Sequence, residues 1–267
     1  MKELTNQDIK DVSLDILNTI HSFCTKNNIQ YSLGYGTLLG AIRHKGFIPW
    51  DDDVDVLMPR PDFEKFCKTY VDSNDYELIN EDRGESFLAY ARVCEKKKTR
   101  VETPAPWCKK KTGVWVDIMP IDGAFEDIKK QDEHYAKALS LYDLSIQGRF
   151  LYLYKESSFR KRLIYWAKRI LGKDILTLVK EHRKVCSLVP LGSTGIVQDI
   201  SCPVSRKKQA YSLSCIEEFV LLPFENKHFY CMKGYDEALR CWYGDYMQLP
   251  PAEKQVYAHS AHKYYWK

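Results

Sequence analysis

The sequence predicts a mixed α/β or α+β fold with a catalytic front half and a largely helical back half. Segments with the alternating pattern of strands interleave with segments of helical periodicity along all 267 residues. The hydrophobic fraction of 45% and the charged fraction of 28% are those of an ordinary globular protein. We divide the chain into a catalytic core (1–125), a mainly helical region (126–220) and a C-terminal strand and helix segment (221–267) that packs back on the core.

Composition excludes several classes of protein. A net charge of +4 is too small to argue for nucleic-acid binding, so we expect no nucleic-acid partner. No apolar run is long enough for a membrane span, and the polar, acidic N-terminus lacks a signal-peptide core. We therefore expect a cytoplasmic protein. The nine cysteines are irregularly spaced, which favours reduced thiols packed as small hydrophobes over a zinc site built from distant cysteines.

The elements of the front half follow from local patterns. A first helix is predicted by apolar residues three and four apart between Ile9 and Phe23, with Thr5 and Asp8 forming a capping box ahead of them. Residues 29–35 alternate as a strand does, and a turn at 34–37 leads into a short apolar helix at 38–42.

Further strands are predicted at 53–58, 87–93 and 114–118, and a helix begins at Pro61. In the back half we expect a long helical stretch at about 127–183. A short strand near 229–231 and a helix at 235–243, ended by Gly244, complete the chain.

The most informative segment is the acidic strand. Asp53 and Asp55 point to the same face of a strand, about 6.6 Å apart, while Val54 and Val56 point into the core. Two neighbouring carboxylates repel each other, and a divalent cation removes that repulsion. The alternative is a solvated acidic edge preceded by turn-forming aspartates.

Two other features support a site at this strand. Asp117 is the one acid in an otherwise apolar strand, where it serves a neighbouring metal site or caps the turn that follows. The turn of Gly34, Gly36 and Thr37 lets a backbone approach a phosphate closely, although a simple tight turn explains it equally well.

Three segments together resemble the LicD family of phosphorylcholine transferases, which is related to the fukutin proteins. They are GYGTLLGAIRHKGFIPWDDDVDVLMPRPDFEKF, GVWVDIMPIDG and YDEALRCWYGDYMQLPPAEKQVYAH. The resemblance implies a nucleotidyltransferase-like mixed sheet, whose Gly-Thr turn, acid-aliphatic-acid strand and third acid are matched here. It also implies transfer of phosphorylcholine from CDP-choline to a sugar hydroxyl of a cell-envelope glycan, a teichoic acid or lipopolysaccharide precursor, with release of CMP.

The roles that we expect from the resemblance and the residue chemistry are as follows. A magnesium or manganese ion would be held by Asp51, Asp53, Asp55 and Asp117. The catalytic residues would be Asp53, Asp55, Asp117, Arg43 and His44, with Asp117 as base or metal ligand. The substrate would be bound by Gly34, Gly36, Thr37, Tyr243 and Tyr246, the two tyrosines facing the quaternary ammonium.

Residues 159–171 carry five cations and several large apolar side chains without an acid. This pattern is typical of a helix on the cytoplasmic face of a membrane, where a lipid-linked acceptor would lie, or of an ordinary surface helix. Two other functions stay open at this point. One is transfer of a nucleoside monophosphate to a small acceptor, and the other is non-catalytic nucleotide binding by the same fold.

Overall fold

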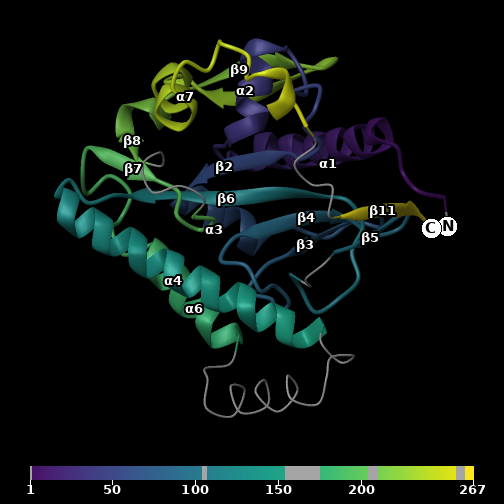
Figure 1. Cartoon of the computed structure of the whole chain (residues 1–267), viewed down its shortest axis with the longest axis horizontal. Helices are drawn as coiled ribbons and strands as arrows, with labels where there is room; N and C mark the ends of the chain where they lie inside the picture. Colours follow the sequence, from purple (N-terminus) through teal and green to yellow (C-terminus); the bar gives the residue numbers. More distant parts are fainter. Residues whose placement is uncertain (1, 104–106, 154–174, 204–209, 257–261) are drawn as a thin grey trace.

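The computed structural model describes residues 2–103, 107–153, 175–203, 210–256 and 262–267 (Figure 1). The helices within them are α1 (Asn6–Asn27), α2 (Tyr35–Arg43), α3 (Arg60–Thr69), α4 (Ile128–Leu153), α6 (Ile175–Cys186) and α7 (Tyr235–Tyr243), with short 3-10 turns η2 (Leu213–Ile216) and η3 (Ala252–Lys254). The strands are β1 (Ser32–Leu33), β2 (Asp55–Pro59), β3 (Tyr76–Ile79), β4 (Ala91–Glu95), β5 (Thr99–Glu102), β6 (Trp115–Gly123), β7 (Ile196–Gln198), β8 (Tyr211–Ser212), β9 (Phe219–Phe224), β10 (Lys227–Met232) and β11 (Lys263–Trp266). The predicted mixed α/β class is confirmed.

Helix α1 forms as its sequence predicts. Thr5 accepts a hydrogen bond from the backbone of Asp8, and the Asp8 carboxylate accepts one from the backbone of Thr5, so the capping box is complete. The apolar stripe from Ile9 to Ile20 is buried against the sheet, where α1 contacts β4 and β6. Helix α3 lies beside it, since the Phe23 ring packs edge-on against Phe66.

A seven-stranded sheet forms the centre of the protein. Five strands follow the order β1-β2-β6-β4-β3, and β7 and β8 continue from the end of β6 (Figure 1). Strands β2 and β6 run parallel, whereas the other pairs are antiparallel. Two antiparallel ribbons, β9 with β10 and β5 with β11, flank this sheet.

The bounds of two strands differ from the prediction. Strand β2 begins at Asp55, so Asp53 precedes the strand, although the alternation of buried and half-buried residues holds through this segment. Strand β1 is two residues long because Tyr35 already opens α2. Strand β4 covers the end of the predicted strand at 87–93. The predictions at 114–118, 229–231 and 235–243 are confirmed by β6, β10 and α7.

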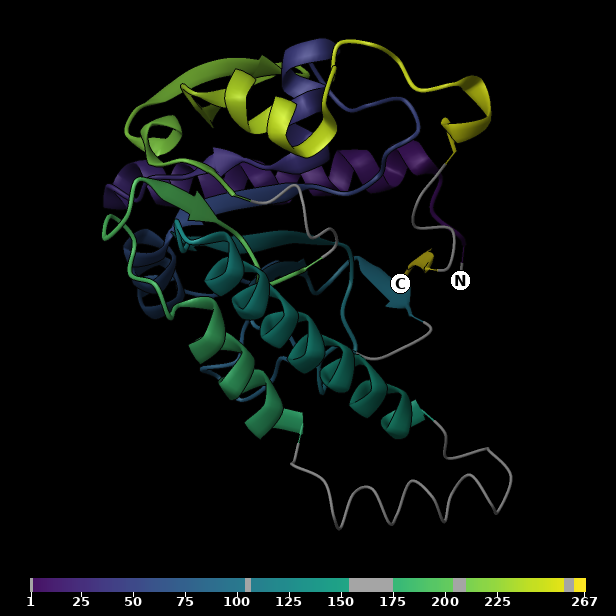
Figure 2. The ribbon, with the colours of Figure 1, turned by 60° about the vertical axis from the view of Figure 1, so that its left-hand side comes forward.

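Within the predicted helical stretch at 127–183, the described residues form two helices, α4 and α6. Helices α4 and α6 lie side by side and run in opposite directions (Figure 2). A small hydrophobic core, separate from the main one, forms at this contact from Tyr135, Ala138, Val185, Cys186 and Ile200. Residues 154–174, which include the predicted membrane-surface segment 159–171, lie outside the described residues.

The C-terminal part packs back on the front half. Helix α7 contacts α2, strand β10 contacts β1, and β11 pairs with β5 (Figures 1 and 2). These contacts hold the C-terminal part of the chain against α2, β1 and β5. The division into three parts stays a prediction.

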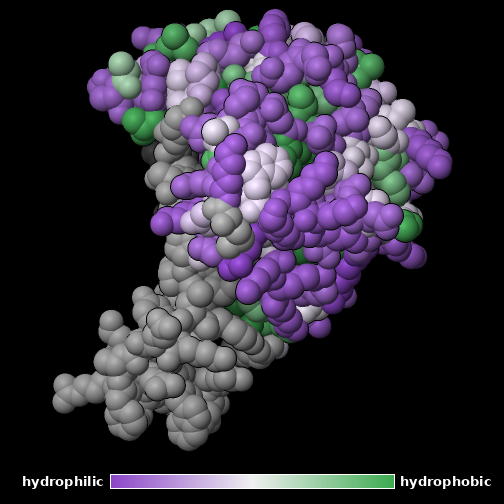
Figure 3. All heavy atoms as spheres, turned by 90° about the vertical axis from the view of Figure 1, so that its right-hand side faces the viewer, coloured by the Kyte–Doolittle hydropathy of each residue, from purple (hydrophilic) through white to green (hydrophobic). Residues whose placement is uncertain are grey.

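The surface and the cysteines agree with the composition. All nine cysteines are free thiols, seven of them buried. The face of the molecule that carries both termini is predominantly hydrophilic (Figure 3). Among the described residues, none of the helices has the length and apolar character needed to cross a bilayer.

Candidate active site

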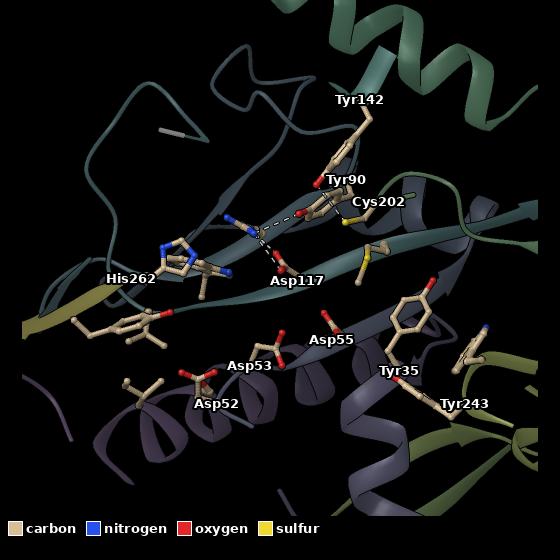
Figure 4. Close-up of a pocket in the computed structure, with 18 residues that line it drawn as sticks. Tyr35, Asp52, Asp53, Asp55, Tyr90, Asp117, Tyr142, Cys202, Tyr243 and His262 are labelled. Atoms are coloured by element: carbon tan, nitrogen blue, oxygen red, sulfur yellow. Dashed lines mark hydrogen bonds and ion pairs between the residues drawn. The ribbon is translucent and has the colours of Figure 1, made fainter. Parts of the chain in front are cut away.

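A cavity of about 470 Å³ opens where β2, β4 and β6 meet the loops around them (Figure 4). Its lining comes from both ends and the middle of the chain. The residues are Ile9, Ser13, Tyr35, Asp52, Asp53, Asp55, Tyr90, Arg92, Val114, Trp115, Asp117, Met119, Tyr142, Cys202, Trp242, Tyr243, His262 and Tyr264. Four acids (Asp52, Asp53, Asp55 and Asp117) thus stand among many aromatic rings, a lining suited to a ligand with both charged and apolar parts.

The predicted acids meet in this cavity. Asp53 and Asp55 line it from one strand segment, and Asp117 lines it from the neighbouring strand. The parallel register pairs Asp55 with Asp117, and the Asp117 amide donates to the Val54 carbonyl at 3.0 Å. Because Val54 and Val56 are buried, the alternation of the strand leaves the acids on the cavity side. The prediction that the three acids gather at one place is confirmed.

Asp55 lies in an unfavourable environment for a charge. Burial, and then the carboxylates of Asp53, Asp117 and Asp51, raise its pKa well above the usual range. Its backbone amide donates to the Thr37 hydroxyl at 2.9 Å, but its carboxylate has no hydrogen-bond or ion-pair partner among the described residues. A buried carboxylate without a partner is the kind of group that a bound cation stabilises.

The Gly-Thr turn is hydrogen-bonded to strand β2. The Gly34 amide donates to the Asp55 carbonyl at 2.8 Å, and a Cβ at position 34 would lie 2.8 Å from Leu57. A Cβ at Gly36 would lie 2.6 Å from a carboxylate oxygen of Asp51, so this glycine makes room for that acid at the first turn of α2. Neither glycine nor Thr37 lines the cavity. The turn predicted to bind substrate therefore positions β2 and Asp51.

Asp117 is held by a cation that sequence reasoning missed. Arg92 of β4 forms an ion pair with Asp117, using Nε to one carboxylate oxygen and a terminal nitrogen to the other. The guanidinium lies between two indole rings, 4.3 Å from the centre of Trp107 and 4.4 Å from that of Trp115. Burial lowers the pKa of Arg92, but the Asp117 charge, the Tyr90 hydroxyl and the hydrogen bond to Asp117 together raise it above the usual value. An arginine inside an apolar strand was the signal in the sequence.

Sequence reasoning also missed the acid Asp199, which contacts the cavity residue Tyr35. Asp199 is buried and accepts hydrogen bonds from the Tyr35 hydroxyl at 3.0 Å and from the backbone and hydroxyl of Ser201. Burial raises the pKa of Asp199 to about 6, although these hydrogen bonds lower it. Tyr35 itself lines the cavity. Because Tyr35 and Asp199 are far apart in the chain, no local pattern indicates this contact.

Arg43 and His44 do not reach the cavity. They stand at the C-terminal end of α2, about 12 Å along the helix axis from its first residue. Arg43 donates to the Tyr246 carbonyl at 2.7 Å and to His44 at 2.9 Å, so it fastens α2 to the chain after α7. Neither residue is among those that line the cavity, and their expected place beside the transferring phosphate stays a prediction.

The two tyrosines expected to face the quaternary ammonium, Tyr243 and Tyr246, lie in different places. Tyr243 lines the cavity, and its side chain is 40% exposed. Tyr246 is buried elsewhere, where its hydroxyl donates to Asp236 at 2.7 Å. Its position on the far side of the turn that ends α7 explains the difference.

In the part of the chain that the structure describes, metal-binding side chains form no preformed metal centre. Among the described residues, no three or more histidine, cysteine or acidic side chains are gathered as a metal centre requires. Asp53 and Asp55 fit a simpler arrangement, in which one or two carboxylates hold Mg²⁺ together with the phosphates of a substrate. Asp117 is occupied by Arg92, and Asp51 lies against Gly36.

The mixed sheet, the Gly-Thr turn and the acids of β2 and β6 define a nucleotidyltransferase-like protein. Residues 28–147 match the family described as LicD/FKTN/FKRP, nucleotidyltransferase domain. The chain is 31% identical, over 99% of both chains, to the lipopolysaccharide cholinephosphotransferase LicD of Haemophilus influenzae. It therefore belongs to the LicD family, which is a family of transferases. Uncharacterized proteins of Rickettsia prowazekii and Rickettsia typhi are each 54% identical over 41 residues, or 15% of this chain and 15% and 13% of theirs.

Proposed function

We propose that this protein transfers phosphorylcholine from CDP-choline to a sugar hydroxyl of a cell-envelope glycan and releases CMP. Support comes from its similarity along nearly the whole chain to a relative named as a lipopolysaccharide cholinephosphotransferase. The observation that carries the proposal is the row of cavity acids, with the Asp55 carboxylate half-buried and without a partner among the described residues. The acceptor would be a lipopolysaccharide or teichoic acid precursor.

A divalent cation fits the acids best at Asp53 and Asp55. Magnesium or manganese bound there would neutralise charge on the phosphates of the donor. Both carboxylates line the cavity and sit next to each other on one face. Asp51 lies beside the first turn of α2, and Asp117 lies opposite Asp55 in the parallel pair of β2 and β6. Both would support the ion from positions behind these two ligands.

Arg92 has the second electrostatic role in this proposal. It lines the cavity, and its position is held by the Asp117 ion pair and by the two indole rings. A cation fixed in place beforehand stabilises negative charge that develops on a transferring phosphate without further rearrangement. Because both Asp117 oxygens accept hydrogen bonds from Arg92, we assign Asp117 to the positioning of Arg92 rather than to proton transfer.

A lipid-linked acceptor would bring the enzyme to the inner leaflet of the membrane. The basic, aromatic segment 159–171 would bind that surface, as its sequence predicts. This part of the proposal depends on the sequence alone, because the segment lies outside the described residues.

The test is a donor panel. Purified protein is incubated with CDP-choline, CDP-ethanolamine or CTP, an acceptor glycan, and either Mg²⁺ or a chelator. We expect release of CMP from CDP-choline that requires the metal and is lost in Asp55→Asn. Release of pyrophosphate from CTP would instead indicate transfer of a nucleoside monophosphate. Consumption of no donor, with CDP-choline bound but intact, would indicate a non-catalytic nucleotide-binding protein.

A further inference from the structure

The cavity has two different aromatic ends separated by the row of acids. Tyr35 and Tyr243 lie beyond Asp55 at one end, and His262 lies at the other (Figure 4). We name the first the α2–α7 end and define it by Tyr35, Trp242 and Tyr243. The opposite end consists of Trp115, His262 and Tyr264, whose rings lie 5.5 to 6.2 Å apart.

The rings of the α2–α7 end are held firmly. The centres of Tyr35 and Trp242 lie 4.6 Å apart, and Tyr211 packs edge-on against Trp242 at 5.5 Å. Tyr35 adopts a φ of 40°, a left-handed conformation that a tyrosine rarely takes, and its hydroxyl is fixed by Asp199. Backbone strain of this kind persists where the surrounding structure holds it in place, and it clusters at functional sites.

Trp242 also has a group that lacks a partner. Its indole N–H is buried and donates no hydrogen bond among the described residues, although the side chain lines the cavity. A buried donor without an acceptor costs stability, which a ligand oxygen would restore. Together with the exposed ring of Tyr243, this indicates that the α2–α7 end receives part of a ligand.

Charge distinguishes the two ends. Asp55 is the acid next to the α2–α7 end (Figure 4), and its carboxylate has no partner among the described residues. Arg43 is also near Tyr243 and keeps its positive charge, but its guanidinium is directed to His44 and to the Tyr246 carbonyl. At the opposite end, the Arg92 guanidinium lies 4.4 Å from the Trp115 ring. Asp55 therefore attracts a positive ligand group to the α2–α7 end, whereas at the opposite end Arg92 stands among the carboxylates of Asp52, Asp53 and Asp117, which also act on Tyr264.

We propose that Tyr35, Trp242 and Tyr243 bind the trimethylammonium group of the donor and so select choline over uncharged head groups. Ring faces attract a cation that has left water, and nearby carboxylates add to that attraction. The nucleotide half of the donor then lies beyond the acids, toward Trp115 and Tyr264. This inference rests on the proposed function, since it assumes a choline-bearing donor.

The experiment compares CDP-choline with its neutral isostere, CDP-3,3-dimethylbutanol, in which carbon replaces the quaternary nitrogen. The kcat/KM for each donor and the inhibition constant of CMP are measured for the wild type and Tyr243→Leu. We expect the wild type to prefer the charged donor about tenfold or more. In Tyr243→Leu this preference should fall about fivefold while the affinity for CMP changes less than about twofold.

A matched control and a second variant complete the design. Tyr264→Leu at the opposite end should keep the preference for the charged donor, even where it lowers activity on both donors. Trp242→Phe keeps a ring face but removes the N–H, so it should lower both activities and keep the preference. Melting temperatures confirm that each variant is folded.

Two outcomes overturn the inference. An equal loss for both donors in Tyr243→Leu, or a matching loss of CMP affinity, would assign the α2–α7 end to the nucleotide. Calorimetry of CDP-choline binding to the wild type separates this result from failure of the proposed function. A wild type that neither binds nor consumes CDP-choline would refute both.

Discussion

Replacing Asp55 by asparagine should stabilise the protein without metal and abolish its turnover. The substitution keeps the shape of the side chain and removes a charge that burial and four neighbouring carboxylates disfavour. It breaks no hydrogen bond, because the Asp55 carboxylate has no partner among the described residues and its backbone bond to Thr37 remains.

The magnitude follows from the strand geometry. Carboxylates two residues apart on a strand are separated by about 6.6 Å, and at an effective dielectric constant of ~20 two charges at that distance repel by about 2.5 kcal/mol. The Asp117 charge is largely neutralised by Arg92, so we do not add its full repulsion. Relaxation of the charges reduces the gain to about 1–2.5 kcal/mol, which corresponds to a rise in Tm of roughly 2–10 °C for a protein of this size.

The pH dependence has a definite sign. The folded state raises the pKa of Asp55, so folded protein holds this proton to higher pH than unfolded protein does. The wild type therefore loses stability as the pH rises from about 4, where an unfolded aspartate ionises. The advantage of Asp55→Asn should vanish at low pH and grow toward neutral pH.

The assay is thermal unfolding from pH 4 to 8 in the presence of a chelator, with CMP release measured in Mg²⁺. Loss of about 4 kcal/mol of transition-state stabilisation would lower the rate about a thousandfold. Added Mg²⁺ should raise the Tm of the wild type and leave that of Asp55→Asn unchanged. The exposed acid Asp132 provides the control, because Asp132→Asn should change neither quantity. A variant destabilised by several kcal/mol, or one that keeps substantial activity, would refute this reasoning.

Three further outcomes are expected. Arg92→Met should destabilise the protein by about 3–5 kcal/mol because it leaves Asp117 buried without its cation. Adding Asp117→Asn should restore most of the decrease in Tm, as measured by calorimetry. Gly36→Ala places a Cβ 2.6 Å from an Asp51 oxygen, so CMP release should fall at least tenfold while Tm changes little; unchanged turnover would show that Asp51 has no part in catalysis. Liposomes rich in anionic lipid should co-sediment the protein at low salt but not at high salt. If reversing the basic charges of 159–171 leaves sedimentation unchanged, the segment does not bind membranes.

Local patterns were sufficient for the elements and for the principal acids. The apolar period and capping box of α1, the alternation around Asp53 and Asp55, and the single acid in the strand of Asp117 each lie within a few residues, so their consequences could be derived from the sequence. The same local reasoning did not show that Arg43 and His44 lie outside the cavity lining. It treated neighbours of the turn in sequence as neighbours in space, whereas α2 carries them away from the cavity.

The tertiary structure alone decided which partners these residues meet. Pairing of β2 with β6 brings Asp117 level with Asp55, pairing of β4 with β6 gives Asp117 its arginine, and the return of the chain after α6 places Asp199 on Tyr35. The packing of α7 on α2 then adds Trp242 and Tyr243 to the same cavity. Such contacts join segments far apart in the chain, and they depend on which buried faces fit together once the whole core has formed. Periodicity reports which face of an element is buried, but it carries no information on the element that covers it.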